Sequence, residues 1–396
     1  MRVLVSSDGI IGMLASIVLS EYFDEVYLVK NKSNKHNQNI NRYFSINLLS
    51  KFFFTSKNLW DCITCEGITE YSQITTLDEP SKKYMNFQSS SIAFDFMGYI
   101  VNEKNIIDNI RKKIETIENI FQIDEVHIDN HSKKSLSISL DDMKLLNIDY
   151  IFLSDSSRED IVNLFSNTKQ TIDYKQDAIV ANLTMNTKNN NMIAYQRFDK
   201  NNIQGLLPVS DNMYNLIWSA KKEIINELYR MSDSQLLSKV NNTLSVMIGE
   251  AKSTSSIARF PLKGFHYKSY RYENIFCIGG AAHSVHPMAG LGLNMGIKDV
   301  FLLEYFLSSF SKDKCNINRL LETFSKRCRI ENSKYFYTIN LLKTFYSDNH
   351  LPNFIRSASM KIFDSNIFFK RKIIETATGI DTLKKYLKDQ YCYTNQ

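Results

Sequence analysis

The hydrophobic pattern of the first thirty residues predicts a strand, a helix and a second strand. Arg2–Val5 is a short apolar run, and Ile10–Tyr22 is apolar on all sides, which is typical of a helix buried on a sheet. Glu25–Lys30 is a second strand-like run, and the turn residues Ser6–Gly9 separate the first strand from the helix. The length and order of this unit predict a βαβ crossover.

The pattern changes farther along the chain. Tyr43–Phe54 has the spacing of an amphipathic helix. Between 172 and 263, three strand-like runs precede a helical pattern at Ser232–Ile248, which indicates a separate α+β unit. A strand returns at Ile275, a glycine-rich loop and a helix to about Ser308 follow it, and the remainder is mostly helical in pattern.

Composition and charge narrow the class of protein. The 396 residues are 43% apolar and 23% charged, as in an ordinary globular protein. A net charge of +6 is only mildly basic, so we expect no nucleic-acid partner.

The six cysteines have no framework spacing, which favours a reducing, cytoplasmic location. The lone pair Cys62 and Cys65 lacks further ligands, so we expect no metal. No secretory signal is visible, and the apolar run Ile10–Leu19 is too short to span a bilayer.

The segment from Asn274 to Leu303 holds five of the thirteen glycines. These are Gly279, Gly280, Gly290, Gly292 and Gly296. The first two end a predicted buried strand without a Cβ, so another group can approach the backbone closely. The next two precede a helix that begins at about Leu293, where free N–H groups and the helix dipole can hold negative charge. Such a segment can bind a flavin or a phosphate. Alternatively, it is a tight strand-to-helix connection that needs glycine only for its backbone shape.

The spacing of this segment resembles the second flavin motif of class A FAD-dependent aromatic monooxygenases, G-D-A-A-H-x-x-x-P-x-x-G-x-G-x-N-x-G-x-x-D. The matching residues are Gly279, Ala281, Ala282, His283, Pro287, Gly290, Gly292, Asn294, Gly296 and Asp299. The resemblance implies FAD as the cofactor. It also implies cofactor contacts at Gly279, Gly280, Ala281, Pro287, Gly290, Gly292, Leu293 and Asn294. The departure is Gly280, because the family has at this position an aspartate that hydrogen-bonds the ribitol chain of FAD.

Further segments resemble one branch of that family, the ubiquinone-biosynthesis hydroxylases. They are Arg42–Asn47, Met97–Val101, Gln196–Phe198, Leu207-Pro208, Ile217–Ser219, Phe260–Leu262 and Ile380–Leu383, and together they span essentially the whole chain. The implied fold class is α/β, with a Rossmann-type FAD-binding domain interrupted by a smaller α+β substrate domain and followed by C-terminal helices. We expect the FAD domain at 1–75, 97–171 and 264–340, the substrate domain at 76–96 and 172–263, and the C-terminal helical segment at 341–396.

The first nucleotide-binding fingerprint of the family, G-x-G-x-x-G, is Ser7-Asp8-Gly9-Ile10-Ile11-Gly12 here. Gly9 and Gly12 are kept as expected cofactor contacts, because the middle glycine lets the backbone approach a pyrophosphate. Ser7 replaces the first glycine and would be strained if its φ had to be positive. At the end of the second strand, Lys30 stands where the family has a glutamate for the adenosine ribose. An ammonium has only donors, so Lys30 either faces a phosphate or points to solvent.

The third flavin motif of the family, G-A-D-G, is Leu153-Ser154-Asp155-Ser156 here. Asp155 is kept and is an expected cofactor contact, but Ser156 replaces a glycine. Arg42 is expected as a cation near the flavin or the substrate, with a surface arginine as the alternative. His283 and His286 are expected to be structural, and we expect no side chain to act as a nucleophile.

The function that the resemblance implies is hydroxylation of a phenolic ring in a prenylated quinone precursor of ubiquinone biosynthesis, with NAD(P)H and O₂. The changes at Lys30, Ser156 and Gly280 motivate an alternative, a flavin-poor and catalytically weak relative that acts as a structural partner in a biosynthetic complex. A flavin reductase or a halogenase on the same fold is a third option. The basic, aromatic stretch Asn353–Lys372 suggests peripheral contact with the inner face of a membrane, or a helix packed on the domain with a solvated basic face.

Overall fold

A six-stranded sheet forms the first layer of the molecule. The computed structural model describes residues 1–30, 41–65, 67–124, 127–132, 135–139, 145–155, 168–188, 192–255, 257–308, 316–347 and 366–387. The sheet has the order β19-β20-β12-β1-β2-β8, and its neighbouring strands are parallel except for β19 and β20. The strands are β1 (Arg2–Val5), β2 (Glu25–Val29), β8 (Ile120–Ile123), β12 (Tyr150–Leu153), β19 (Arg271–Tyr272) and β20 (Ile275–Cys277). This order is that of a Rossmann-type sheet and confirms the predicted βαβ unit.

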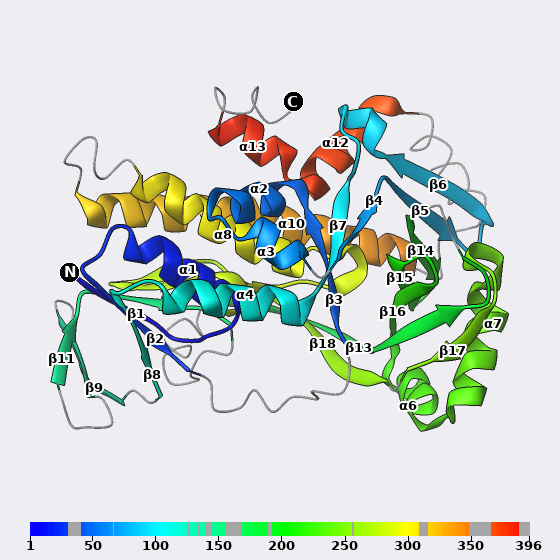
Figure 1. Ribbon diagram of the computed structural model, residues 1–396, viewed down its shortest axis with the longest axis horizontal. Coiled ribbons are helices and arrows are strands. Elements are labelled where there is room, and N and C mark those ends of the chain that lie inside the picture. Colours follow the sequence, from blue (N-terminus) through cyan, green and yellow to red (C-terminus); the bar gives the residue numbers. More distant parts are fainter. Residues whose placement is uncertain are drawn as a thin grey trace.

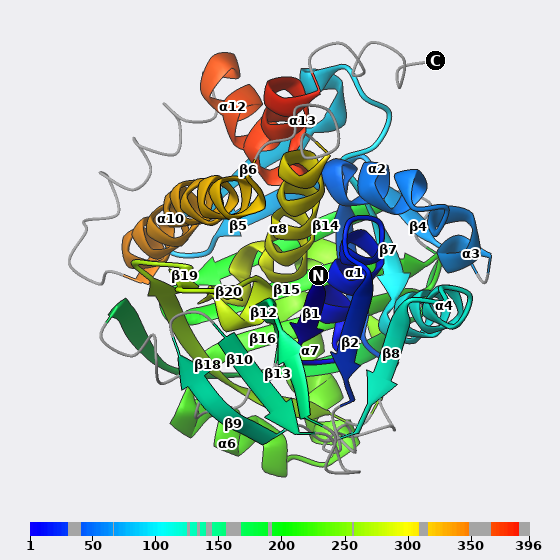
Figure 2. The ribbon, with the colours of Figure 1, turned by 90° about the vertical axis from the view of Figure 1, so that its left-hand side faces the viewer.

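Helix α1 (Ile10–Ser20) lies between this sheet and other helices. Ten of its residues, Ile10 to Leu19, are buried, which explains why it is apolar on all sides. It packs against α4 (Glu103–Glu115) and against α8 (Gly292–Leu307), and α8 lies above the sheet beside α1 (Figure 2). The long helix predicted after the glycine-rich loop is therefore confirmed.

A small antiparallel sheet corrects the helix expected over Tyr43–Phe54. Strand β3 (Tyr43–Asn47) pairs with β7 (Gly98–Asn102), which also pairs with β4 (Thr69–Tyr71). The helix α2 (Leu48–Ser56) begins only after β3, because the Asn47 side chain caps it by accepting the backbone N–H of Ser50. The short helix α3 (Trp60–Thr64) follows, and the exposed thiols of Cys62 and Cys65 lie there.

A nine-stranded sheet makes up the other end of the molecule (Figure 1). Its strands are β5 (Gln73–Asp78), β6 (Lys83–Gln88), β13 (Lys169–Met185), β14 (Ile193–Asp199), β15 (Asn202–Ser210), β16 (Met213–Lys221), β17 (Ala251–Thr254), β18 (Ala258–Tyr267) and β21 (His283–Ser284). Helices α6 (Lys222–Arg230) and α7 (Asp233–Ile248) cover one side of it around a separate apolar core. The predicted domain boundaries stay a prediction. The sheet itself starts at Gln73 and includes β18 as far as Tyr267.

The remaining elements frame these two sheets. Strands β9 (His127–Ser132), β10 (Ser135–Ser139) and β11 (Leu145–Ile148) form a three-stranded antiparallel sheet. Short 3₁₀ turns are η1 (Ser89–Ile92), η3 (Gly279–Ala281) and η4 (Pro287–Ala289). The C-terminal helices are α10 (Ile317–Ser347), α12 (Ile367–Thr378) and α13 (Ile380–Tyr386). Within the described ranges, no helix is long and apolar enough to cross a membrane, and no three His, Cys, Asp or Glu side chains gather as a metal site.

Candidate functional site

The glycine-rich loop between β20 and α8 leaves part of its backbone uncovered. Gly279 and Gly290 have φ values of +54° and +60°, which is the left-handed region that favours glycine. Gly280, Gly290 and Gly292 are exposed, and a Cβ built on Gly292 would meet no atom within 4 Å. The first N–H groups of α8 begin at Gly292 and have no intrahelical acceptor. This end of α8 therefore presents N–H donors and a partial positive charge to an open surface.

Two glycines of the loop region serve packing. A Cβ on Gly279 would lie 2.8 Å from Ile11 Cγ2, and one on Gly296 would lie 2.7 Å from the same side chain. The space at Gly12 is smaller still, since a Cβ added there would lie 1.8 Å from the carbonyl oxygen of Ser7. These three glycines let α1 approach β1, the loop and α8 closely, as the third glycine of a Rossmann fingerprint does.

Asp299 anchors the start of the loop from inside the molecule. Its Oδ2 accepts the backbone N–H of Gly279 at 3.0 Å and lies 2.8 Å from His283 Nε2, and its Oδ1 accepts the Asn332 side chain at 2.7 Å. Burial alone would raise the pKa of Asp299, but the charge and hydrogen bond of His283 hold it below its ordinary value. Asp299 therefore anchors the start of the loop at Gly279, and His283 has a structural role because it contacts the same carboxylate oxygen.

The amide of Asn294 is fully engaged with the protein. Its Oδ1 accepts the backbone N–H of Asn47 at 3.0 Å and the Ser50 hydroxyl at 2.8 Å. Its Nδ2 donates to the carbonyl oxygens of Ser45 at 2.7 Å and of Gly290 at 3.2 Å. Asn294 thus ties β3 and α2 to the first turn of α8, and it shapes the expected flavin site by holding backbone in place.

Asp155 lies between the loops that follow β1 and β20. The backbone N–H groups of Gly280 and Ile11 donate to its carboxylate, the former at 2.8 Å to Oδ1. Burial raises the pKa of Asp155, and these two hydrogen bonds oppose the rise. Gly9 faces the same carboxylate, because a Cβ there would lie 3.0 Å from Oδ2. Ser7 is not strained: its backbone is outside the left-handed region, and its hydroxyl accepts the N–H of Gly9 at 3.2 Å.

Lys30 lies at the end of β2 with its side chain 46% exposed, and its Nζ is 3.8 Å from Asp124 Oδ1. Its ammonium group therefore faces solvent and the carboxylate of Asp124, the residue that follows β8. Arg42 Nη1 lies 3.1 Å from Glu103 Oε1, and its guanidinium stands 5.1 Å from the Phe260 ring. This arginine joins the start of β3 to α4 and β18. Ser156 lies outside the described residues.

The other expected contacts lie in the same loop. Ala281 is buried, and Pro287 is the first residue of η4. Leu293 is partly buried in the first turn of α8. His286 Nδ1 accepts the N–H of Met288, so its Nε2 carries the proton and donates to Gln176 Oε1 at 3.1 Å. Burial lowers the pKa of His286 to about 3, so it stays neutral and ties the loop to β13.

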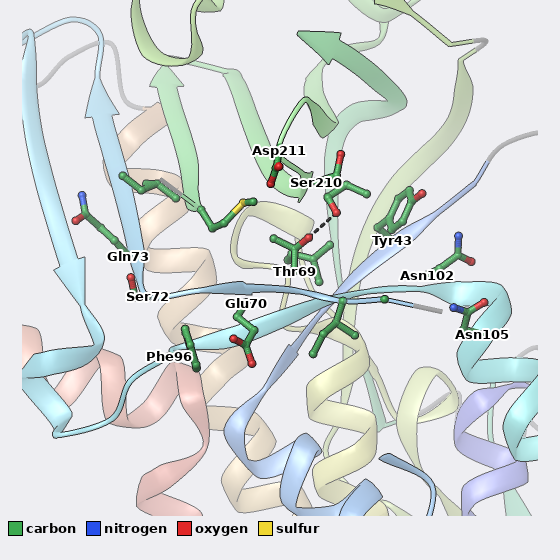
Figure 3. Close-up of a pocket in the computed structure, with 16 residues that line it drawn as sticks. Tyr43, Thr69, Glu70, Ser72, Gln73, Phe96, Asn102, Asn105, Ser210 and Asp211 are labelled. Carbon is green, nitrogen blue, oxygen red and sulfur yellow. Dashed lines mark hydrogen bonds between the residues drawn. The ribbon is translucent and has the colours of Figure 1, made fainter. Parts of the chain in front are cut away.

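A cavity of about 1150 Å³ lies beside the small sheet (Figure 3). It is lined by Tyr43, Gly67, Ile68, Thr69, Glu70, Ser72, Gln73, Phe96, Ile100, Asn102, Asn105, Met192, Ile193, Val209, Ser210 and Asp211. Figure 3 shows Thr69 pointing toward the Ser210 side of the opening, where its hydroxyl donates to the carbonyl oxygen of Val209, while Glu70 points away from it. Sequence reasoning named none of these residues as a contact: Tyr43 and Ile100 lie in two of the resembling segments, and most of the others come from segments without a motif.

The register of the small sheet places this cavity near the glycine-rich loop. Tyr43 and Ser45 on β3 pair with Asn102 and Ile100 on β7, so these four residues share one face. Tyr43, Ile100 and Asn102 line the cavity, and Ser45 Cβ lies 3.8 Å from the position of a Cβ on Gly290. The cavity and the Gly290 turn therefore lie along the same face of this sheet.

The residues present fit FAD at its ring and ribitol end. The exposed backbone at Gly290 and Gly292 and the N–H groups of α8 suit the flavin ring, and the carboxylate of Asp155 suits hydroxyl groups. At the adenosine end, position 30 offers an ammonium group and no acceptor.

Comparisons with known proteins find similarity to an FAD-binding family and to monooxygenases. Residues 157–334 match the family model described as FAD binding domain. The ubiquinone biosynthesis monooxygenase COQ6, mitochondrial, of Xenopus tropicalis is 27% identical over 359 residues, which are 79% of this chain and 77% of that protein. The human protein of the same name is 26% identical over 364 residues, 79% of this chain and 76% of that protein.

Solved structures share the fold. The p-nitrophenol 4-monooxygenase PnpA of Pseudomonas putida has a TM-score of 0.74 at 13% identity and covers 95% of this chain and 98% of its own. PqsL of Pseudomonas aeruginosa, a probable FAD-dependent monooxygenase, has a TM-score of 0.73 at 16% identity and covers 91% of this chain and 99% of its own.

The fold, the glycine-rich loop and these matches support an FAD-dependent monooxygenase of the class A type. The resemblance to the ubiquinone-biosynthesis hydroxylase branch, which the sequence predicted, is confirmed by the similarity to the ubiquinone biosynthesis monooxygenases. The expected FAD cofactor is confirmed by the same matches, which favour the enzyme over the alternative of a structural partner.

Proposed function

We propose that this monooxygenase hydroxylates the ring of a prenylated phenolic quinone precursor. The observation that carries the proposal is the similarity over 79% of the chain to ubiquinone biosynthesis monooxygenases. The cavity beside the small sheet supports it, because 1150 Å³ is ample for an aromatic ring with a prenyl substituent.

The lining of the cavity favours a neutral ring. Apolar side chains such as Phe96, Ile100 and Val209 stand beside hydroxyl and amide groups, which suits a phenol. Of the two charged lining residues, Asp211 lies on the Ser210 side of the opening and Glu70 points away from it, and the described lining holds no Lys or Arg. A substrate that carries a carboxylate would therefore meet like charge, so we propose a phenol without a carboxyl group.

The chain's own part in the reaction is positioning and charge stabilisation. When bound, FAD takes reducing equivalents from NAD(P)H and activates O₂. The N–H groups at the start of α8 stabilise negative charge near Gly292. Asn294 and Asp299 hold this helix end and Gly279 in a fixed geometry, and no side chain need act as a nucleophile.

The test uses purified protein, FAD, NAD(P)H and a prenylated phenol in detergent micelles under isotopically labelled O₂. We expect one labelled oxygen atom in the ring, detected by mass spectrometry, and a slower reaction with the matched prenylated hydroxybenzoate. Stoichiometric FAD together with NAD(P)H oxidation but no labelled product would contradict the hydroxylase assignment. A faster reaction with the benzoate would contradict only the neutral ring.

We also propose peripheral contact with an anionic membrane through the N-terminal turn of α12. Ile367 and Phe368 are 72% and 86% exposed there. The exposed or partly exposed cations Lys370, Arg371 and Lys372 follow directly. Exposed apolar groups beside cations suit the surface of an anionic bilayer, where a prenylated substrate would be dissolved.

A further inference from the structure

We infer that Gln196 is a positioning residue for the monooxygenase reaction. Its side-chain amide ties η4, the outer turn of the glycine-rich loop, to the nine-stranded sheet that borders the cavity. The tie fixes the exposed backbone at Gly290 relative to a substrate in that cavity. The role in the reaction rests on the function proposed above, whereas the tie itself is a property of the apoprotein.

The glycine-rich loop bridges the two large sheets. It starts at the end of β20, where Asp299 holds Gly279, and it leads into α8. Between these ends, His283 and Ser284 form β21, which pairs with β18 of the nine-stranded sheet. The middle of the loop is therefore held by the sheet that borders the cavity, although the loop starts from the other sheet.

Two glutamine side chains of the nine-stranded sheet hold the turn that follows β21. Gln176, on β13, accepts the Nε2–H of His286 at 3.1 Å. Gln196, on β14, donates its amide N–H to the backbone carbonyl oxygen of Met288. These two contacts are two residues apart in the loop, so together they fix η4 on the sheet.

The bond from Gln196 sets the direction of the backbone that leads to Gly290. The Met288 side chain is buried in an apolar cluster with Phe198 and Ile203, but apolar packing is not directional. A hydrogen bond to the Met288 carbonyl oxygen is directional. Gly290 follows two residues later with φ at +60°, and a glycine restrains the backbone little by itself. An external tie is therefore needed to place the uncovered backbone that suits the flavin ring.

The same strand borders the cavity. Ile193, on β14, lines the cavity three residues before Gln196, and β14 pairs with β15 on one side and β5 on the other. A substrate against Ile193 and a ring against Gly290 are thus both positioned relative to β14. Since reacting atoms must lie about 3–3.5 Å apart, a displacement of about 1 Å can slow the transfer about a hundredfold. NAD(P)H, a proton and O₂ then give NAD(P)⁺ and hydrogen peroxide, and no oxygen enters the ring.

The first test measures the tie without any flavin. Gln196→Met removes the donor and keeps the length of the side chain. In the apoprotein, we expect hydrogen exchange of the backbone amides from Met288 to Leu291 to become about tenfold faster, because the turn opens more easily without the bond. The dissociation constant for FAD should change less than about threefold, because Asn294 and Asp299 still hold the two ends of the loop.

The second test measures the fraction of consumed NAD(P)H that yields hydroxylated phenol, at full occupancy by FAD. We expect Gln196→Met to lower this fraction about threefold or more and to release the difference as hydrogen peroxide. Gln196→Glu tests the donor directly, because an ionised carboxyl group repels the Met288 carbonyl oxygen and a protonated one donates to it. Its product fraction should rise as the pH falls from about 8 to about 5.5, since burial beside a carbonyl oxygen raises the pKa of a carboxyl group. The pH profile of Gln196→Met should stay parallel to that of the original protein.

Gln170→Met is the matched control. Gln170 lies on β13 of the same sheet, where its side chain accepts the Tyr337 hydroxyl at 3.0 Å. The same substitution there should change neither the exchange of the loop amides nor the product fraction.

Each outcome decides a different part of the inference. Unchanged exchange in Gln196→Met would show that the tie is absent. Faster exchange with an unchanged product fraction would show that the bond is only structural, and the positioning role would be wrong. If the original protein hydroxylates no phenol while exchange still depends on Gln196, the tie stands, and the role in the reaction fails together with the proposed function.

Discussion

The carboxylate of Asp299 accepts the backbone N–H of Gly279, which lies twenty residues earlier in the chain, at 3.0 Å. Gly279 is held in the left-handed region there, with φ at +54°. The same carboxylate also meets His283 and Asn332, and it is fully buried. One side chain on α8 thus fixes the backbone from which the flavin loop starts.

Replacing Asp299 tests this anchor. Asp299→Ala leaves the N–H of Gly279 and the His283 ring without their acceptor, so we expect a loss of about 3 kcal/mol in the free energy of unfolding and weaker FAD binding. Asp299→Asn keeps one acceptor oxygen and should lose less on both measures. Urea unfolding and a flavin titration measure them. Equal losses for the two variants would show that the acceptor itself does not matter.

The pH dependence of this group has a definite sign. The folded protein holds the pKa of Asp299 below its ordinary value, so its contribution to stability is present above about pH 4 and is lost as the pH falls through the folded pKa. The Asp299→Asn protein should lack this part of the loss of stability in acid.

His286 should make the protein less stable in mild acid. Its folded pKa is about 3, against an ordinary value of 6.5, because burial disfavours the charged ring. Below about pH 6.5 the unfolded chain binds a proton that the folded chain refuses, so stability should fall by up to about 1.4 kcal/mol per pH unit. Above that pH the contribution is constant.

The variant His286→Gln should reduce this slope, measured by urea unfolding between about pH 4.5 and pH 7. Part of the slope should remain, because burial also lowers the pKa of His266, to about 4. NMR of the His286 ring should show no titration in the same range. A ring that titrates near pH 6.5 would contradict the buried neutral form.

The sequence predicted what depends on local pattern, and it missed what depends on long-range contact. The βαβ unit and the loop at Gly279–Gly292 are local, so periodicity and glycine spacing sufficed for them. The helix expected at Tyr43 was wrong, because pairing with β7 overrides the helical spacing of its first residues. The hydrogen bond from the Gly280 N–H to Asp155 joins residues 125 positions apart, and the local motifs that contain the two residues do not predict that they meet.

Lys298, on α8, is a buried cation whose Nζ has no hydrogen-bond partner within the described part of the chain. Its ammonium group lies 3.9 Å from the centre of the Tyr335 ring. Burial lowers its pKa from 10.5, so the unfolded chain holds this proton more tightly, and stability should rise as the pH rises toward about 10.5.

Replacing it by an apolar residue of similar length should therefore stabilise the protein. We expect Lys298→Met to raise the free energy of unfolding at pH 7 by about 1 kcal/mol or more and to flatten the alkaline rise. Lys326→Met, on the exposed face of α10 where the side chain is 70% exposed, is the control and should change little. A loss of stability in Lys298→Met would mean that the charge is satisfied in the fold.

The proposed membrane contact of α12 predicts binding to vesicles that depends on both charge and apolar surface. The protein should sediment with vesicles rich in phosphatidylglycerol and much less with neutral phosphatidylcholine vesicles, since cations flank the exposed rings. Phe368→Asp should abolish most of the binding, because it removes the most exposed apolar group of that turn. Val246→Asp is the matched control: Val246 is 85% exposed but lies on α7, which is at the lower right in Figure 1 while α12 is at the top, and its loss should leave binding unchanged. Equal losses in the two variants would show that vesicle binding does not involve α12 specifically, and no sedimentation of the original protein with anionic vesicles would rule the contact out.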